Sequence, residues 1–491
     1  MCLAMGFAFA EAADAVDIFD SVRSHIRERL LETSTPSAAV AVARSGKVLW
    51  EEGIGWADRE KRIPATGRTA YSLASISKPL TATGLMRLVE DGRIRLDRPI
   101  NDYLRTAKLV ARAGRIEEVT VRRVAGHTAG LPLHGQYFYA DERDGKPSVD
   151  ETIRRYGQSV FVPGERYFYS NIGYGVLGEV IAQASGLGYA DYMREAIFQP
   201  LTMTDTFIGA GTEMDLRDDV ATRYSSDDQP LPFYDSDHAG ASDAYSSAHD
   251  LVRFGLFHLN KRLKGQRSIL SGTAIAAMHE PTTSTGPGTG YGLGWRTALR
   301  QDGRNLVYHR GSMAGVSTLL LLIPREDIAL VVLTNKRTEL TFDIADALLA
   351  AVLSDWQPMR EPPEDASANS AGPSRPPTGH IGTWSGVLSV PAEQHEMPLT
   401  LRIQPSGDVR VRLGEQMETL LQGAHFTDDR LTGDFTGEID SVDVRRRRPG
   451  YVRLSLQFRG NVLNGGATAL ARHPRGNALT HWVDLRKHHE E

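Results

Sequence analysis

The strongest constraint on the fold is a pair of continuous apolar runs joined by a short turn. The runs are Ser317–Ile323, STLLLLI, and Ile328–Thr334, IALVVLT, and the turn between them is Pro324–Asp327. Each run is too short for an ordinary helix and is apolar at consecutive positions, which is typical of a strand covered on both faces. Leu306–Gly311 precedes them as a third run. Together they predict a buried antiparallel meander, which a helix over residues 343–356 closes.

The N-terminal part of the chain supplies further elements of the same domain. Residues 14–32 carry an apolar stripe at helical spacing, and Thr35-Pro36 ends it. Ala38–Ala43 and Val48–Glu51 flank a turn and predict a β-hairpin. A second helix follows Ser75. The order helix, hairpin, helix fits an α+β fold with a helix packed on a sheet.

The composition changes sharply near residue 357. Pro, Ser and charged residues dominate 357–379 and no apolar period survives there, so this stretch predicts a linker. From residue 380 onward, short strand-like runs alternate with turn residues and predict a small all-β domain, either a barrel or a sandwich. The expected division is 1–19 as an N-terminal tail or signal remnant, 20–356 as the catalytic domain, 357–379 as the linker, and 380–491 as the β domain.

Composition excludes several classes of function. The net charge of -5 gives no reason to expect nucleic acid as a partner, and the single cysteine, Cys2, excludes an intramolecular disulfide and a Cys-based metal site. No run is long enough to cross a bilayer. The first ten residues, MCLAMGFAFA, lack the basic start of a signal peptide. The protein is expected to be cytoplasmic as written, or periplasmic or secreted if those residues end a longer signal.

A possible nucleophile lies in the stretch Ser75-Ile76-Ser77-Lys78. A helix predicted from this point places Ser75 at its N-terminus, where free N–H groups favour a developing negative charge, and places Lys78 on the same face. A lysine among apolar neighbours can be neutral near pH 7 and can then accept the serine proton. A chain of this length holds roughly one or two Ser-x-x-Lys matches by chance, so the other motifs must decide.

Two further motifs follow in order. Tyr169-Ser170-Asn171 is the only Tyr-x-Asn in the chain and lies in a loop before a predicted helix. A tyrosine there is either core packing or a phenol that can ionise at one wall of a cleft. His309-Arg310-Gly311 lies on the predicted core strand and could line a cleft beside the Ser75 helix. His127, in a Gly-rich loop, is expected to be structural and bonded to backbone.

Taken together, these motifs resemble those of the serine β-lactamase and penicillin-binding-protein superfamily, most of all class C β-lactamase-like esterases and D-amino-acid peptidases. The resemblance covers roughly residues 20–356. It implies a five-stranded antiparallel sheet flanked by helices beside a helical region, with the site between them. The β domain weakly resembles the lipocalin-like domain appended to some relatives.

The resemblance also implies roles for individual residues. Ser75 would be the acylated nucleophile, Lys78 its proton partner and Tyr169 a second base that serves the leaving group and the incoming water. Asn171 would hold the substrate amide. His309 stands where many relatives carry lysine, which favours an esterase, amidase or D-peptidase over a β-lactamase. Gly311 would let the substrate backbone pass, and the N–H groups of Ser75 and Ser312 would bind the oxyanion.

Alternatives remain open at this stage. A relative that releases carrier-bound peptides captures the same acyl-enzyme with an internal amine, which makes a peptide cyclase the second hypothesis. A β-lactamase or a non-catalytic sensor of acylating ligands is the third. The expected partner is a small ester, amide or peptide, with no cofactor, no metal, no nucleic acid and no membrane span. Tyr291 and Trp295 are expected to form an apolar rim in a mobile Gly/Thr/Ser-rich stretch.

Overall fold

The computed structural model describes residues 18–142, 145–209, 218–359, 375–391, 393–427, 429–445, 450–471 and 476–488. Its centre is an antiparallel sheet of nine strands in the order β11-β12-β13-β14-β15-β16-β1-β2-β3. The five long strands among them confirm the predicted sheet, and short strands extend it at both edges. The strands are β11 (Thr283–Gly286), β12 (Thr289–Tyr291), β13 (Arg296–Leu299), β14 (Asn305–Met313), β15 (Val316–Ile323), β16 (Ile328–Thr334), β1 (Ser37–Arg44), β2 (Lys47–Asp58) and β3 (Ile63–Pro64).

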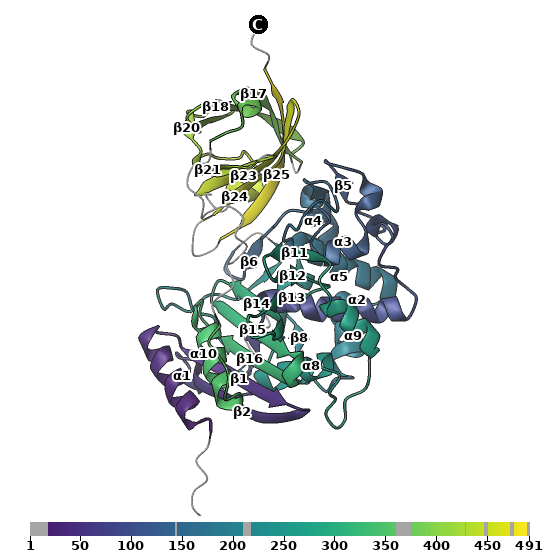
Figure 1. The fold of residues 1–491 in the computed structure, drawn as a ribbon, viewed down its shortest axis with the longest axis vertical. Helices are drawn as coiled ribbons and strands as arrows, with labels where there is room; N and C mark the ends of the chain where they lie inside the picture. Colours follow the sequence, from purple (N-terminus) through teal and green to yellow (C-terminus); the bar gives the residue numbers. More distant parts are fainter. Residues whose placement is uncertain are drawn as a thin grey trace, which may run out of the picture.

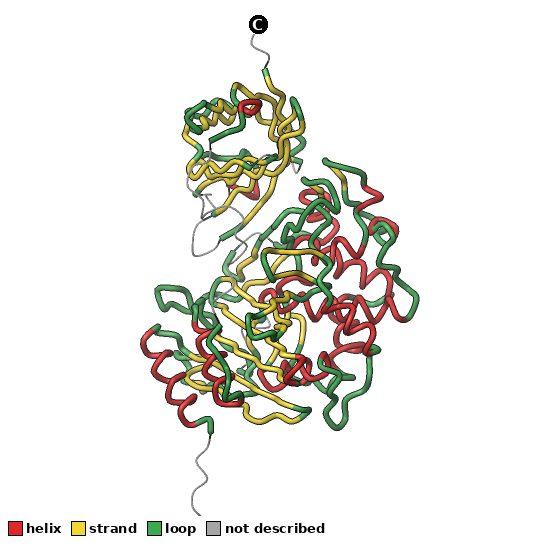
Figure 2. Tube along the Cα trace, in the orientation of Figure 1, coloured by secondary structure: helices red, strands yellow, loops and turns green. Residues whose placement is uncertain are grey.

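The two faces of strand β1, near the middle of this sheet, differ in side-chain size. Strand β1 reads SAAVAVAR, and Val40 and Val42 point to one face while Ala39, Ala41 and Ala43 point to the other. The valine face packs against helices α1 (Asp20–Glu32) and α10 (Leu340–Val352). The alanine face lets helix α8 (Ala248–His258) come close. The sheet is therefore buried on both sides, as its continuous apolar strands require (Figure 2).

A helical region covers the alanine face beyond α8 (Figure 1). Helices α2 and α5 pack on each other at its centre, and α7 lies between them and the turn that precedes α2. The helices are α2 (Ser77–Glu90), α3 (Val121–Ala125), α4 (Val149–Tyr156), α5 (Asn171–Ser185), α6 (Tyr189–Met193), α7 (Ala239–Ser242) and α9 (Gly272–His279). Among the described residues, a three-stranded sheet and two strand pairs tie the loops together. The sheet is β4 (Tyr71–Ser72), β10 (Ala244–Ser246) and β8 (Phe207–Ile208), and the pairs are β5 (Val110–Ala111) with β7 (Gln158–Ser159) and β6 (Tyr137–Tyr139) with β9 (Tyr234–Ser236).

The C-terminal part is a nearly closed antiparallel barrel of nine strands with a filled apolar interior. It stands beside α4 and β6 of the first part (Figure 1). Part of the predicted linker, residues 360–374, and part of the predicted tail, residues 1–17, lie outside the described residues, and the domain boundaries stay predictions. The barrel elements are β17 (Gly382–Val390), β18 (His395–Ile403), β19 (Val409–Leu413), β20 (Thr419–Leu420), β21 (Gln422–Phe426), β22 (Arg430–Phe435), α11 (Val442–Arg445), β23 (Tyr451–Arg459), β24 (Val462–Leu470) and β25 (Ala478–Lys487).

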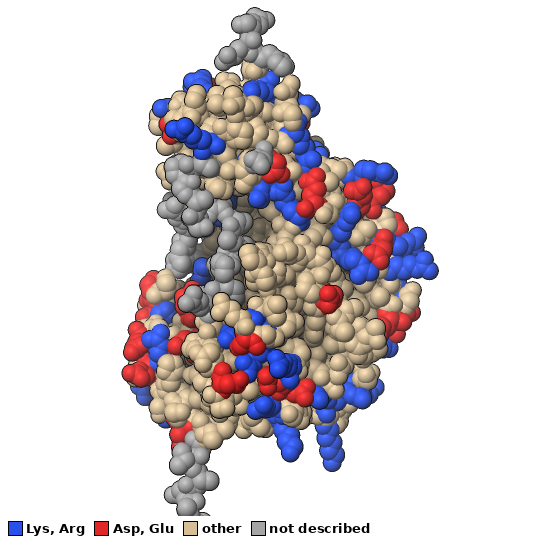
Figure 3. All heavy atoms as spheres, viewed as in Figure 1, with Lys and Arg blue, Asp and Glu red and all other residues tan. Residues whose placement is uncertain are grey.

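Two whole-molecule observations bear on partners. None of the helices in the described ranges is both long and apolar enough to cross a membrane. On the face drawn in Figure 3, basic and acidic side chains alternate and no continuous patch of either sign forms.

Candidate active site

Ser75 lies in a tight turn that the surrounding structure holds in a strained conformation. The turn is the 3-10 helix Ala74–Ile76, directly before α2, so the serine precedes the helix by two residues. Ala74 has a φ of 48°, a left-handed value that costs a residue with a Cβ roughly 1–2 kcal/mol. Ala74 and Ile76 are buried while Ser75 is half-buried. The turn therefore presents one hydroxyl and hides its neighbours, an arrangement common at functional sites.

Lys78, one turn later on α2, is fully buried and meets three oxygen atoms. Its Nζ lies 3.1 Å from Ser75 Oγ, 2.8 Å from Asn171 Oδ1 and 3.2 Å from the carbonyl oxygen of Ala241. Burial, helped by the charge of Arg296, lowers the pKa of Lys78 well below its usual value. The burial of Lys78 thus favours its neutral amine form.

If Lys78 is a neutral amine, its three contacts give a role to each valence of the nitrogen. A neutral amine has two N–H groups and one lone pair. The Asn171 and Ala241 oxygens are carbonyl oxygens that can only accept, so they take the two N–H groups. The lone pair is left for the Ser75 hydroxyl proton. The orientation of the Asn171 amide is fixed independently, because its Nδ2 donates to the His134 carbonyl at 2.8 Å.

Tyr169 lies against the same amine. Its ring centroid is 4.7 Å from Lys78 Nζ and 6.5 Å from the His309 ring. His127 holds the Tyr169 loop: its carbonyl accepts from Phe168 N–H at 2.7 Å, and its Nδ1 accepts from Ser170 N–H at 3.1 Å. The prediction that His127 is a structural residue bonded to backbone is therefore confirmed.

Strand β14 forms the opposite wall of the site. His309 is buried, and burial together with the charges of Lys78 and Arg296 lowers its pKa well below the usual value. Its neutral ring donates from Nδ1 to the Arg310 carbonyl at 2.8 Å and accepts the Tyr291 hydroxyl at Nε2, 3.0 Å away. A histidine so engaged carries no positive charge for a substrate carboxylate.

Gly311 allows β14 to lie directly against the nucleophile turn. A Cβ added there would lie 2.1 Å from the Leu73 carbonyl oxygen and 2.2 Å from Thr318 Oγ1. Ser312 follows on the same strand and is exposed. The structure thus brings Ser75, Lys78, Tyr169 and Asn171 together, with β14 beside them, and their chemical roles stay predictions.

One expectation about the rim of the site is wrong. Tyr291 and Trp295 are fully buried instead of forming an exposed apolar edge. The Tyr291 hydroxyl bonds His309, and Trp295 packs against the rings of Phe254 and His258. The Gly-rich composition of the stretch suggested mobility, whereas these two aromatic side chains anchor it in the core.

Sequence reasoning missed other groups at the site. The half-buried Arg296 on β13 places its guanidinium carbon 5.6 Å from the Tyr169 ring centroid. An aromatic and aliphatic cluster packs on Ala74, next to the nucleophile. No sequence motif marks either group, because only the folded chain brings Arg296 and the cluster residues, from segments far apart in the sequence, close to the site. The cluster consists of Tyr139, Tyr234, Met313 and Val316, with Tyr137, Leu231 and Ala314 at its margin.

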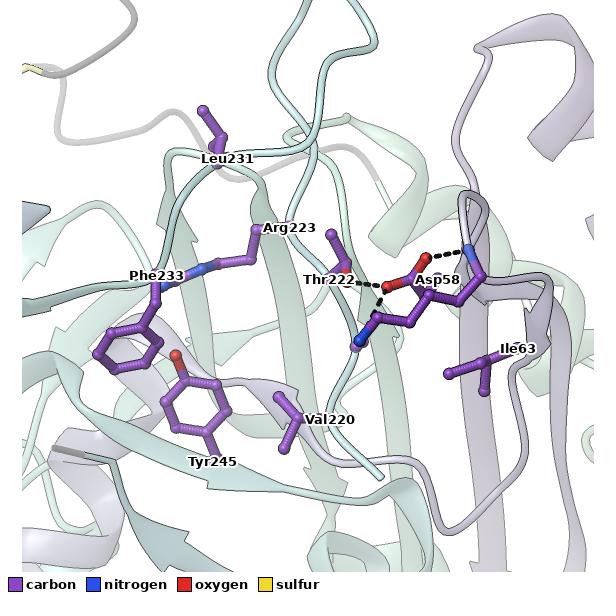
Figure 4. Close-up of a pocket in the computed structure, with 10 residues that line it drawn as sticks. Asp58, Ile63, Val220, Thr222, Arg223, Leu231, Phe233 and Tyr245 are labelled. Atoms are coloured by element: carbon purple, nitrogen blue, oxygen red, sulfur yellow. Dashed lines mark hydrogen bonds and ion pairs between the residues drawn. The ribbon is translucent and has the colours of Figure 1, made fainter. Parts of the chain in front are cut away.

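A pocket of about 70 Å³ shares Leu231 with that cluster (Figure 4). Asp58 accepts the Thr222 hydroxyl at 2.9 Å and the Lys61 N–H at 2.7 Å, and Arg223 reaches toward Phe233. The Arg223 guanidinium carbon is 3.5 Å from the ring centroid of Tyr234. None of the predicted site residues lines this pocket.

Within the described ranges, one group of residues could hold a metal ion: His134, Asp237 and His238, all fully buried. Asp237 accepts His134 Nε2 at 2.9 Å and His238 Nδ1 at 2.7 Å. Burial opposes ionisation, but the two histidines lower the pKa of Asp237 overall. Metal-bound histidines usually donate their second nitrogen to an acceptor, and both second nitrogens here have no partner. The geometry fits a carboxylate hydrogen-bonded by two histidines.

Comparison with known proteins places the chain in a family. Residues 22–354 match the family described as Beta-lactamase. Penicillin-binding protein 4* of Bacillus subtilis is 27% identical over 70% of this chain and 78% of its own length. Protein flp of Staphylococcus aureus is 25% identical over 64% of this chain, and the match spans 62% of that relative.

Solved structures agree on the fold. The octameric penicillin-binding protein homologue of Pyrococcus abyssi has a TM-score of 0.60 at 24% identity, covering 94% of this chain and 99% of that one, so the likeness includes the barrel. SurE with D-Leu has a TM-score of 0.61 at 24% identity, with 96% and 99% covered. A class C β-lactamase has a TM-score of 0.59 at 21% identity and covers 72% of this chain. Because the family match spans well over half of the sequence, this chain belongs to the β-lactamase family, within the superfamily of serine hydrolases that includes the penicillin-binding proteins.

Proposed function

We propose that this protein forms an acyl-enzyme on Ser75 and hydrolyses an ester or peptide bond, as an esterase or D-amino-acid peptidase. The observation that carries the proposal is the buried Lys78 nitrogen, which lies between the Asn171 and Ala241 carbonyl oxygens and Ser75 Oγ, 3.1 Å away. A base with a lowered pKa at hydrogen-bonding distance is what an otherwise weak hydroxyl nucleophile needs.

The proton steps follow from this geometry. As Ser75 Oγ attacks the carbonyl carbon, its proton moves to Lys78 Nζ. The phenol of Tyr169 lies beside this amine and would protonate the departing alcohol or amine as the carbon–leaving-group bond breaks. In the second half-reaction water attacks the acyl ester and gives its proton to the Tyr169 phenolate, while the Lys78 ammonium returns its proton to Ser75 Oγ as the bond between the acyl carbon and Oγ breaks. The N–H groups of Ser75 and Ser312 would bind the oxyanion.

The surroundings favour a substrate with a carboxylate and an apolar acyl part. His309 is neutral and cannot supply the charge that a lysine would at that place. Arg296 supplies a permanent charge instead, 5.6 Å from the Tyr169 ring. The cluster next to Ala74 offers aromatic and aliphatic surface. A short peptide with a free C-terminal carboxylate combines both features, and D-Leu, bound in one structure of similar fold, is a reasonable residue to test.

The decisive test is intact-mass spectrometry after incubation with a fluorophosphonate. The wild type should gain one adduct mapped to Ser75, and Ser75→Ala should gain none. Thermally unfolded wild type serves as the control for non-specific labelling. An adduct that persists in Ser75→Ala would refute the assignment of the nucleophile.

A substrate panel then separates the activities. Peptides with a D-residue before the scissile bond and a free C-terminal carboxylate should turn over faster than the C-terminal amides of the same peptides. Arg296→Gln should reduce this preference by raising KM for the free acids only. Product masses distinguish hydrolysis from capture by an amine, which a D-terminal peptide thioester would reveal as a cyclic product. Faster turnover of β-lactams than of peptides or esters would contradict the proposal.

A further inference from the structure

The barrel touches the catalytic part at a segment that also holds Asn171. Residues 133–135 lie between the two. On one side, the Leu133 carbonyl accepts the Asn171 backbone N–H at 2.8 Å, and the His134 carbonyl accepts Asn171 Nδ2 at 2.8 Å. On the other side, Gly135 exchanges two backbone hydrogen bonds of 2.8 Å with Ala478, the first residue of barrel strand β25. One residue therefore separates the barrel from the carbonyl that orients Asn171.

A second contact runs through side chains. The Tyr156 hydroxyl, at the end of α4, donates to Asp443 of the barrel at 2.7 Å, and Arg155 pairs with the same carboxylate at 3.0 Å. The Tyr156 ring packs on His134, with centroids 4.9 Å apart. Both the tyrosine ring and the aspartate are buried. The side chain of His134 is thus held by the barrel-anchored Tyr156 on one face.

His134 needs such support because its backbone is strained. Its φ is 49°, a left-handed value that residues with a Cβ adopt only where their surroundings impose it. Asp237 accepts from its ring at 2.9 Å, and Thr152 donates to the same carboxylate at 3.1 Å. Contacts from several elements therefore set the direction of the His134 carbonyl. The next residue, Gly135, is fixed by its two hydrogen bonds to Ala478 of β25.

The direction of that carbonyl matters for the chemistry of Lys78. An asparagine side chain has an acceptor end and a donor end, and the His134 carbonyl takes the donor end. If the carbonyl turned away, the amide could flip and present Nδ2 to Lys78. The amine would then have to use its lone pair to accept from Asn171, and that lone pair would be lost to the Ser75 hydroxyl.

We propose that the C-terminal barrel is a positioning domain for catalysis: strand β25 and Asp443 hold the segment 133–135 so that the Asn171 amide leaves the Lys78 lone pair to Ser75. Ala478, Tyr156 and Asp443 are the positioning residues, and none of them touches the reacting atoms. This inference rests on the proposed acylation of Ser75.

The test uses the full-length chain and separates binding from acylation. Ala478→Pro removes the N–H that donates to Gly135, and Tyr156→Phe removes the bond to Asp443 while keeping the ring on His134. Each should slow fluorophosphonate or ester acylation at saturating reagent by at least tenfold, with the half-saturating concentration changed less than twofold. Arg459→Ala is the matched control. It breaks an exposed ion pair between the barrel and Glu165, 2.9 Å long, that has no link to Asn171, and it should acylate at the wild-type rate.

A double-mutant cycle with Asn171→Ala distinguishes positioning from loose packing. The alanine removes the amide whose direction the segment 133–135 is proposed to set, and it places no charge beside Lys78. In that background Ala478→Pro and Tyr156→Phe should have little further effect on the acylation rate. If these variants only loosen the packing, each should instead lower the rate by the same factor as in the wild-type background. Additive effects, or wild-type acylation rates in both single variants, would overturn the inference. A wild-type protein that never acylates Ser75 would instead refute the proposed function, and this inference with it. If Ala478→Pro does not fold, Tyr156→Phe carries the same test.

Discussion

At the scale of single residues, the lowered pKa of Lys78 is the property of the site that is most directly testable. It is a buried amine whose pKa lies well below that of a free lysine, chiefly because burial disfavours its charged form. A base acts in its deprotonated form, so acylation should rise with pH through this lowered pKa. The rate should reach its plateau well below the ordinary lysine value of about 10.5.

The measurement is kcat/KM for a p-nitrophenyl ester as a function of pH. Lys78→Arg, whose guanidinium stays protonated, should lose the acylation step across the whole range. A profile that keeps rising with unit slope up to pH 10 would show that Lys78 titrates as a solvated amine, and it would exclude the amine as the base at neutral pH.

Tyr169 offers a second prediction at this scale. Its phenol is invoked as a proton donor and acceptor, so Tyr169→Phe should lower kcat by about 10²–10⁴, the usual contribution of a general acid–base. KM should change little, because the ring contacts with Lys78 and His127 survive the substitution. Steady-state kinetics on an ester and a peptide would test this. Equal losses in kcat and in affinity would indicate a packing role.

The sequence predicted the site where its signals are local. Ser75 and Lys78 are one helical turn apart, and Tyr169-x-Asn171 is a contiguous motif, so spacing alone placed each pair. Arg296, the Ala241 carbonyl and His134 have no such signal. They reach the site only because the sheet and the loops close around it. The mistaken rim at Tyr291 and Trp295 has the same origin, since composition does not reveal which aromatic side chains find a core.

At the scale of elements, β14 lies very close to the nucleophile turn. Gly311→Ala would place a methyl group 2.1 Å from the Leu73 carbonyl oxygen, a backbone atom that cannot simply move aside. Overpacking of this kind costs about 1–3 kcal/mol. Because the displaced turn carries Ser75, activity should fall more steeply than stability. Thermal unfolding and acylation rates of the same preparation would show both.

Gly67→Ala is the control for this substitution. Its Cβ would meet only Glu51 atoms at 3.7 Å and the Glu52 nitrogen at 3.7 Å, which are ordinary contacts. Stability should stay within about 0.5 kcal/mol of the wild type. Full activity in Gly311→Ala would mean that β14 and the turn can separate without harm to the site.

The elements themselves were predictable to different degrees. The runs at 317–323 and 328–334 became β15 and β16 with nearly the predicted bounds, because strands buried on both faces are continuously apolar. The first helix of the described residues begins at Asp20. The predicted start at residue 14 lies outside the described residues. Strand β2 runs to Asp58, well past the predicted hairpin end at Glu51. Gly53 and Gly55 concealed the continuation, because glycine is typical of turns and uncommon inside strands.

At the scale of the whole molecule, the barrel and the catalytic part share one small apolar cluster. Trp482 of β25 is 6% exposed and packs with Ala113, Val160 and Phe161. Replacing a well-buried tryptophan with alanine costs about 3–5 kcal/mol. Trp482→Ala should therefore weaken the coupling of the two parts and resolve their thermal unfolding into two transitions in a calorimetric scan.

Met417→Ala is the control for the tryptophan variant, since its side chain is 87% exposed on the barrel, and it should leave the scan unchanged. A single transition at an unchanged temperature in Trp482→Ala would mean that the polar contacts alone keep the two parts together.

The same cluster has a practical consequence for anyone who shortens the gene. A protein that stops before the barrel would leave Val160 and Phe161 facing water, beside Gly135, whose backbone would lose its two hydrogen bonds to Ala478. Exposed apolar surface next to unpaired backbone N–H and C=O groups commonly leads to self-association. Such fragments are expected to aggregate or to be recovered as oligomers. Aggregation of the isolated catalytic part would then result from the surface that the barrel normally covers, and not from a misfolded core.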